Sequence, residues 1–271
     1  MLKLWSDSSL CNFFNEIFNF LKETDPSITE IWCEISNIPF FKKLKETELI
    51  YFLEKFEFIS LKKGNYIDYI VIDKISFILD SLKFLKYDIR FLSEILDYHG
   101  FEVLIKEILL KNNYRATTNF RFSNFSNLKS NVFQKRFEID IIGIYLKYIL
   151  IIDAKQWKRK DSFNSLNKAA NLQYYRVIAL RKNPEAFLRL ITKILGEDTE
   201  INRHLPFILI PVMVTLEDNS IQLNENQIPL VSVYKFNAFL QEIPKNLHYF
   251  KTIQIKKIIR QEKLNKYFIQ K

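Results

Sequence analysis

Residues 137–157, FEIDIIGIYLKYILIIDAKQW, contain two apolar runs on either side of a short break. Runs of this length, rich in isoleucine, predict two buried strands that pair as a hairpin. Each run carries an acid, because Asp140 interrupts the first run and Asp153 ends the second, two residues before Lys155. Carboxylates on buried strands cost free energy unless a positive partner compensates them, so this stretch indicates a functional site.

Strand geometry suggests how these side chains meet. Side chains alternate along a strand, so Asp153 and Lys155 share a face. A tight turn at Leu146 and Lys147 would put Asp140 opposite Asp153, with Cβ atoms about 4.5–5.5 Å apart. That turn lacks Gly and Asn-Gly, so a slip of one residue, which would separate the two acids, stays open.

An opposed pair of carboxylates is suited to one hard divalent cation. Mg²⁺, or Mn²⁺ in its place, is the natural candidate, because Mg²⁺ takes few carboxylates together with waters and phosphate oxygens. With a phosphodiester as substrate, the cation would polarise the phosphoryl oxygen and activate a water. Lys155 would position that water or stabilise charge that develops on the phosphate. A plain ion pair between Asp153 and Lys155 is the alternative interpretation.

Composition narrows the class of protein. The 271 residues are 48% hydrophobic, which is typical of a packed core, and the formal net charge is +9. That excess favours a polyanionic partner, although a lysine-rich proteome would also produce it. Cys11 and Cys33 are too few for a disulfide framework. The amino terminus lacks a signal-peptide pattern, and no apolar run approaches 18 residues, so we expect a cytoplasmic protein with no membrane segment.

Periodicity predicts the α/β fold class, with a mixed sheet flanked by helices. It also predicts that the chain divides into three segments. Residues 1–95 form a mostly helical module with a β-hairpin around Gly64, for which a winged helix is one option; a long helix covers about 76–98. Residues 96–245 form the main domain, with the order α-β-β-β-α-α-β-β-α. Residues 246–271 form a basic helical tail.

Within the main domain, turn and cap residues help to delimit four elements. A strand spans 113–123, and the polar residues 123–131 form a loop. One helix spans about 165–182, and another begins at Pro184 and ends before Gly196.

Glu102 in an early helix, Asp140 on the second strand and Asp153-Ala154-Lys155 at the end of the third resemble the PD-(D/E)XK nuclease superfamily. Over residues 96–243 the sequence is similar in style to those of archaeal Holliday-junction resolvases and of Mrr-like and NERD-like nucleases. This resemblance implies a restriction-endonuclease-like fold. It also implies that Asp140, Asp153, Glu102 and the carbonyl of Ala154 bind the metal, and that Lys155 is the catalytic lysine.

Two positions depart from the pattern of that superfamily. Ile139 stands in place of the motif proline, which is a common replacement. Asp153 stands where Glu is more usual, which shortens the reach of the carboxylate by one methylene group. Because the carboxylate reaches less far toward a metal, this departure slightly favours a member of the superfamily that has lost its activity.

Several neighbours of the lysine are candidates for contact with nucleic acid. Gln156 follows it directly and would orient water or phosphate, or form a strand-end hydrogen bond. Lys158, Arg159 and Lys160 form a basic run that would bind phosphates or lie in solvent. Gln173 falls on the apolar face of its predicted helix, where a polar group needs a partner.

These patterns favour a Mg²⁺-dependent deoxyribonuclease, an endonuclease, with DNA as its partner. Two alternatives stay open: a nuclease-fold protein that binds DNA without cutting it, and an interaction protein without nucleic-acid chemistry. A homodimer would follow if the substrate were a Holliday junction.

Overall fold

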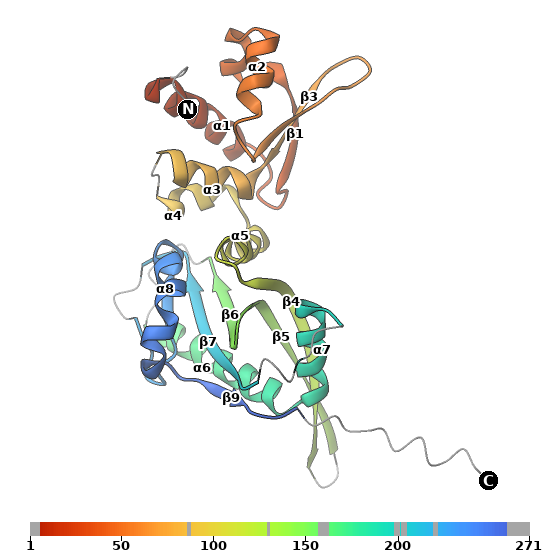
Figure 1. Ribbon diagram of the computed structural model, residues 1–271, viewed down its shortest axis with the longest axis vertical. Helices are drawn as coiled ribbons and strands as arrows, with labels where there is room; N and C mark the ends of the chain where they lie inside the picture. Colours follow the sequence, from red (N-terminus) through yellow and green to blue (C-terminus); the bar gives the residue numbers. More distant parts are fainter. Residues whose placement is uncertain are drawn as a thin grey trace, which may run out of the picture. The chain divides into compact units, whose positions relative to one another are not determined.

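Figure 1 shows the computed structural model of the chain, which describes residues 6–85, 88–128, 131–156, 163–197, 201, 205–218 and 222–258. The chain divides into two compact units, Met1–Glu107 and Ile108–Lys271. This division falls within helix α5 (Tyr98–Lys111), whereas the sequence placed it between residues 95 and 96.

The first unit combines helices with a three-stranded antiparallel sheet in the order β1-β3-β2. Its elements, besides short 3-10 turns, are α1 (Asp7–Lys22), β1 (Glu30–Glu34), α2 (Glu46–Leu53), β2 (Ile59–Lys62), β3 (Tyr69–Asp73), α3 (Lys74–Leu85), α4 (Ile89–Leu92) and the first part of α5. Phenylalanine rings fill its core; the centroids of Phe13 and Phe52, for example, lie 4.7 Å apart in an edge-to-face pair.

The hairpin expected around Gly64 is confirmed, because β2 and β3 pair on either side of it. One strand of this unit was not expected, and one other expectation is wrong. Strand β1 adds to the hairpin, since Ile31 and Cys33 are buried while Trp32 between them is exposed, the period of a half-buried strand. The long helix expected over 76–98 is broken, because α3 ends at Leu85 and Asp88 starts a new helix by accepting the backbone N–H of Arg90.

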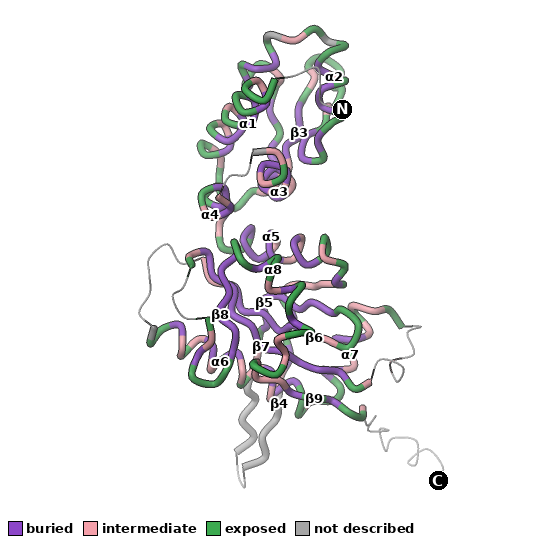
Figure 2. Tube along the Cα trace, turned by 60° about the vertical axis from the view of Figure 1, so that its left-hand side comes forward, coloured by how far each residue is buried: buried purple, intermediate pink, exposed green. Residues whose placement is uncertain are grey.

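The second unit is built on a mixed sheet in the order β4-β5-β6-β7-β8, with β9 paired to β7. Its strands are β4 (Arg115–Leu128), β5 (Asn131–Tyr145), β6 (Tyr148–Lys155), β7 (Phe207–Thr215), β8 (Leu230–Ser232) and β9 (Ile253–Ile255). The first three strands run antiparallel, and β6, β7 and β8 run parallel to one another. The tube in Figure 2 shows that β6, β7 and residues 139–144 of β5 are largely buried.

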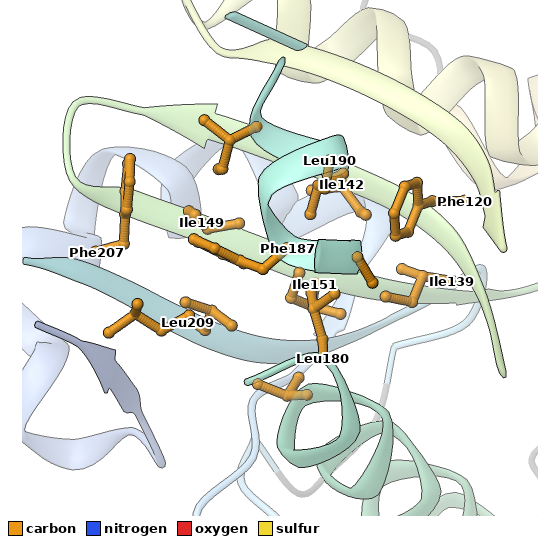
Figure 3. Close-up of a cluster of buried hydrophobic side chains, with 14 of the residues drawn as sticks. Phe120, Ile139, Ile142, Ile149, Ile151, Leu180, Phe187, Leu190, Phe207 and Leu209 are labelled. Carbon is orange, nitrogen blue, oxygen red and sulfur yellow. The ribbon is translucent and has the colours of Figure 1, made fainter. Parts of the chain in front are cut away.

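Helices α6 (Phe163–Arg181), α7 (Pro184–Leu195) and α8 (Val233–Asn246) flank this sheet (Figure 1). Leu180 of α6 and Phe187 of α7 pack with Ile142, Ile151 and Leu209 of the strands in one apolar cluster, shown in Figure 3. The mixed sheet with flanking helices and the predicted element order from α5 to α8 are confirmed. The expected start and end of α7 are also confirmed, with Pro184 first and Gly196 as the cap.

Two expectations for the second unit are wrong. The residues expected to form a polar loop, 123–131, are strand up to Leu128 and again from Asn131, so β4 and β5 form a long two-stranded arm. Residues 246–271 were expected to be helical, but within them Ile253–Ile255 form β9 and Leu247–Tyr249 form a 3-10 turn, and residues 259–271 lie outside the described residues. Ile253 and Ile255 are buried in the core with exposed Gln254 between them, which is the period of a strand.

Across the ranges that the structure describes, no helix combines the length and the apolarity needed to span a membrane.

Candidate active site

The hairpin between β5 and β6 decides the register of the two acids. Tyr145 pairs with Tyr148 across the Leu146-Lys147 turn, and the ladder runs on to Ile141, which pairs with Ile152. The predicted turn and register are therefore confirmed. Leu146 adopts a φ of 52°, a left-handed conformation that is unfavourable for a leucine.

Beyond the last backbone pair of β5 and β6, the side chain of Asp140 continues the hydrogen bonding between the two strands. Its Oδ2 accepts the backbone N–H of Ala154 at 3.1 Å. A carboxylate thus satisfies a buried donor that a strand carbonyl would otherwise satisfy. Asp140 is 8% exposed, and this bond fixes its carboxylate beside the end of β6.

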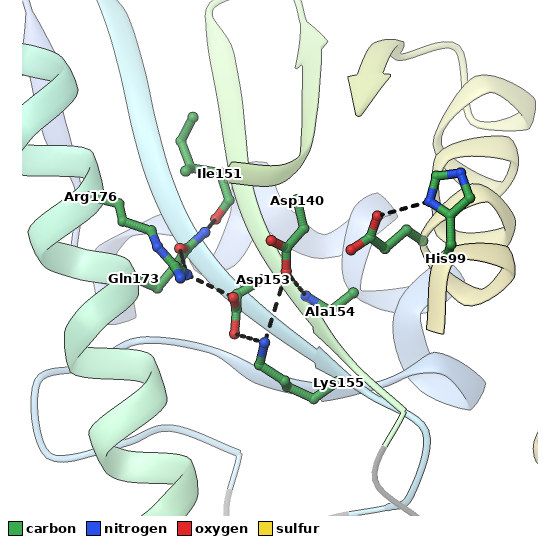
Figure 4. Close-up of polar contacts among 9 residues, drawn as sticks. His99, Asp140, Ile151, Asp153, Ala154, Lys155, Gln173 and Arg176 are labelled. Carbon is green, nitrogen blue, oxygen red and sulfur yellow. Dashed lines mark hydrogen bonds and ion pairs between the residues drawn. The ribbon is translucent and has the colours of Figure 1, made fainter. Parts of the chain in front are cut away.

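The three side chains singled out in the sequence lie together (Figure 4). Nζ of Lys155 lies 3.3 Å from Oδ2 of Asp153 and 4.0 Å from Oδ2 of Asp140. Asp153 is 1% exposed, while the Lys155 side chain is 23% exposed. Solvent therefore reaches the cluster from the lysine side.

Helix α6 supplies a second cation that sequence reasoning missed. Nη1 of Arg176 donates to Oδ1 of Asp153 at 2.7 Å and to Oε1 of Gln173 at 2.9 Å. Gln173 is fully buried and donates through Nε2 to the carbonyl of Ile151 at 2.7 Å. The partner expected for Gln173 is thus the β6 backbone, and the i, i+3 spacing of Gln173 and Arg176 was the signal that could have revealed the arginine.

The charges in this cluster do not balance at Asp140. Burial, the negative charge of Asp153 and a hydrogen bond with Asp153 raise the pKa of Asp140 to about 7, against smaller opposing effects of Lys155 and the Ala154 N–H. Two cations lie beside the two acids, but the ion pair of Arg176 is with Asp153. The site therefore favours further positive charge near Asp140.

The chemistry of these donors fits a hard divalent cation. Asp140 and Asp153 present carboxylate oxygens from adjacent strands, and Mg²⁺ commonly takes only one or two carboxylates and keeps several waters. Within the described parts of the chain, no cluster of three or more His, Cys, Asp and Glu side chains is arranged to hold a metal. Waters and substrate oxygens would complete the coordination, in competition with Lys155 and Arg176 for the oxygens of Asp153.

The other predicted site residues are placed as follows. Glu102 lies on α5 in the first unit, where it is 4% exposed and its Oε2 is 3.6 Å from Nδ1 of His99. Its role as a metal ligand stays a prediction. Gln156 follows β6 and is half-buried. The basic run of Lys158, Arg159 and Lys160 lies outside the described residues.

No family model matches the sequence, and no curated protein matches it. Among solved structures, the chain is similar to the crystal structure of protein VC1899 from Vibrio cholerae, with 13% sequence identity and a TM-score of 0.32. The match covers 90% of this chain and 54% of that chain, so this chain spans about half of the other's length. A similarity at this TM-score supports no conclusion about the fold or activity of this chain.

Proposed function

We propose that this protein is a metal-dependent endonuclease that hydrolyses DNA phosphodiester bonds, with a PD-(D/E)XK-type site on a restriction-endonuclease-like fold. The observation that carries the proposal is the meeting of Asp140, Asp153 and Lys155 at the adjoining parts of β5 and β6. The formal charge of +9 is consistent with a polyanionic substrate.

Each of the three residues has a distinct role in this proposal. Asp140 and Asp153 hold Mg²⁺ or Mn²⁺, which when bound would supply Lewis-acid polarisation of the phosphate and a lowered pKa for the attacking water. Lys155 places its ammonium group where negative charge develops on the phosphate and stabilises it there. Ala154 contributes its carbonyl to the cation.

Arg176 acts as a positioning residue. Its bond to Oδ1 fixes the Asp153 carboxylate, and its bond to Gln173 fixes the guanidinium in turn. An arginine that already compensates Asp153 also favours a second candidate function, in which the chain binds DNA without cutting it. In that case the ion pairs of Asp153 take the place of a bound cation.

Cleavage of supercoiled plasmid in Mg²⁺ or Mn²⁺, compared with EDTA, tests the proposal. A covalently closed circle has no ends, so conversion to nicked or linear forms reports an endonuclease. The informative variants are Asp153→Asn and Lys155→Ala, and Lys147→Ala is the matched control, because Lys147 is exposed in the turn of the same hairpin.

We expect the wild type and Lys147→Ala to cut, and both site variants to lose at least a hundredfold in rate while they still bind DNA. DNA binding by the wild type without metal-dependent cleavage of plasmid, linear or branched substrates would favour the second candidate. Cleavage that persists in Asp153→Asn would show that the carboxylate site does not take part in the reaction.

A further inference from the structure

A groove separate from the carboxylates runs between α6 and β9. These two elements lie side by side in the second unit (Figure 1), and the groove encloses about 660 Å³. Its helical wall is a stripe at i, i+4 and i+7, made of Tyr174, Ile178 and Arg181, and residues 251–257 form the other wall.

Every charged side chain that lines this groove is positive. Arg181 comes from α6, and Lys251, Lys256 and Lys257 come from the β9 segment. Arg181, Lys256 and Lys257 are exposed, and none of the four forms an ion pair within the described part of the chain. Four cations around one concave surface repel one another, so the groove favours a ligand with several spaced negative charges.

The β9 segment is held firmly enough to present these cations. Ile253 and Ile255 are buried in the core cluster, and β9 pairs antiparallel with β7. The N–H of Lys251 donates to the carbonyl of Gln227 at 2.9 Å, and its ammonium lies 5.4 Å from the centroid of the Tyr174 ring. The groove therefore combines anchored cations with an aromatic wall, a combination found in surfaces that follow a nucleic-acid backbone.

Helix α6 relates this groove to the carboxylate site. Arg176 of α6 contacts Asp153, and Arg181 lies five residues farther along the same helix. At 1.5 Å per residue the two arginines are about 7.5 Å apart along the axis. At about 100° per residue their side chains also point about 140° apart, so the groove lies on another side of α6 than the carboxylate site.

We propose that the α6–β9 groove binds the sugar-phosphate backbone of the nucleic acid on which the protein acts, outside the carboxylate site. The choice of DNA as that nucleic acid rests on the proposed function, but the binding itself requires neither the metal nor cleavage. A concave surface suits a rod-shaped polyanion better than a flat anionic membrane. Phosphate contacts release counterions, so the groove also makes binding dependent on salt.

The test measures binding of the full chain to a fluorescent 25-base-pair duplex by anisotropy, in EDTA, across a series of salt concentrations. The groove variant is Arg181→Gln with Lys256→Gln and Lys257→Gln. The control variant removes the same charge at three exposed lysines that do not line the groove, as Lys147→Gln with Lys193→Gln and Lys245→Gln. Thermal unfolding of both variants verifies that they fold.

We expect the groove variant to lose roughly tenfold in affinity and about three in the slope of log K against log[salt], with smaller losses in the control. Equal behaviour of the two variants would overturn the proposal, because net charge alone would then explain binding. The proposal also fails if the groove variant loses binding to vesicles that contain phosphatidylserine but keeps its binding to DNA. Because the measurement omits metal, its outcome is independent of whether Asp153 and Lys155 support cleavage.

Discussion

Nη1 of Arg176 lies 2.7 Å from Oδ1 of Asp153, which joins the middle of α6 to the end of β6. Asp153 is 1% exposed and has Lys155 on its other oxygen, so each of its two carboxylate oxygens has a cation. Asp140 lies farther from Lys155, whose Nζ is 4.0 Å from its Oδ2. Burial and the negative charge of Asp153 raise the pKa of Asp140, and these contacts determine how the site should respond to substitution.

Arg176→Ala should destabilise the metal-free protein by about 2–4 kcal/mol, because it leaves a buried carboxylate with one partner fewer. Urea unfolding in EDTA measures this loss. Mg²⁺ should restore more stability to the variant than to the wild type, because the cation replaces the missing charge. Arg181→Ala on the same helix is the control and should change stability by less than about 0.5 kcal/mol. A similar loss in both variants would contradict the prediction.

Gln173→Leu should cost about 1–3 kcal/mol in the free energy of unfolding, because it leaves the Ile151 carbonyl without its Gln173 donor and removes one of the two acceptors of Arg176. If the substituted protein cleaves DNA, its rate should also fall, since Arg176 would hold Asp153 less firmly. Leu172→Ala, at an exposed position next to it on α6, should have little effect on either quantity. Unchanged stability of Gln173→Leu would mean that the buried bond from Gln173 to the Ile151 carbonyl contributes nothing to the free energy of unfolding.

Stability in EDTA should fall as the pH rises from about 4 to about 7, because of Asp140. The pKa of this group is raised to about 7 in the folded protein, against 3.8 for an ordinary aspartate. Between these values the folded state keeps a proton that the unfolded state has lost, so a rise in pH favours unfolding. The difference in unfolding free energy between the wild type and Asp140→Asn, measured by urea at pH 4.5 and 8, reports this contribution. A difference that does not change with pH would rule out a raised pKa.

Leu146→Gly should stabilise the protein by about 0.5–1 kcal/mol. Leu146 has a φ of 52°, a left-handed conformation that costs an ordinary residue about 1–2 kcal/mol, while glycine adopts it freely but loses more chain entropy on folding. Lys147→Gly, at the neighbouring turn position without a positive φ, should give no gain. Thermal unfolding of the two variants compares them, and equal shifts in Tm would argue against strain at Leu146.

The parts of the fold that follow from local patterns were predictable. Alternation and hairpin geometry placed Asp140 opposite Asp153, even though the turn between them has no glycine. Pro184 and Gly196 fixed α7, because each residue has a specific backbone role at a helix end. Gln173 was recognisable as a buried polar group that needed a partner.

The features that were missed depend on contacts between distant parts of the chain. Arg176 resembles any other helical arginine until α6 packs over β6 and brings it to Asp153. Strands β1 and β9 are only five and three residues long, and each exists because a neighbouring strand completes its hydrogen bonds. The β4–β5 arm exceeded its expected length because pairing between the strands outweighed the preference of its polar residues for a loop.

The two ladders that flank β6 end at different residues. On one side β6 stays paired with β7 as far as Lys155, but on the other side its pairs with β5 end at Ile152. The acids and the lysine thus lie beyond the end of the β5–β6 ladder, and the backbone bonds between β6 and β7 do not involve the side chains of Asp153 and Lys155. The backbone pairing of this sheet therefore does not itself require an acid or a lysine at these two positions.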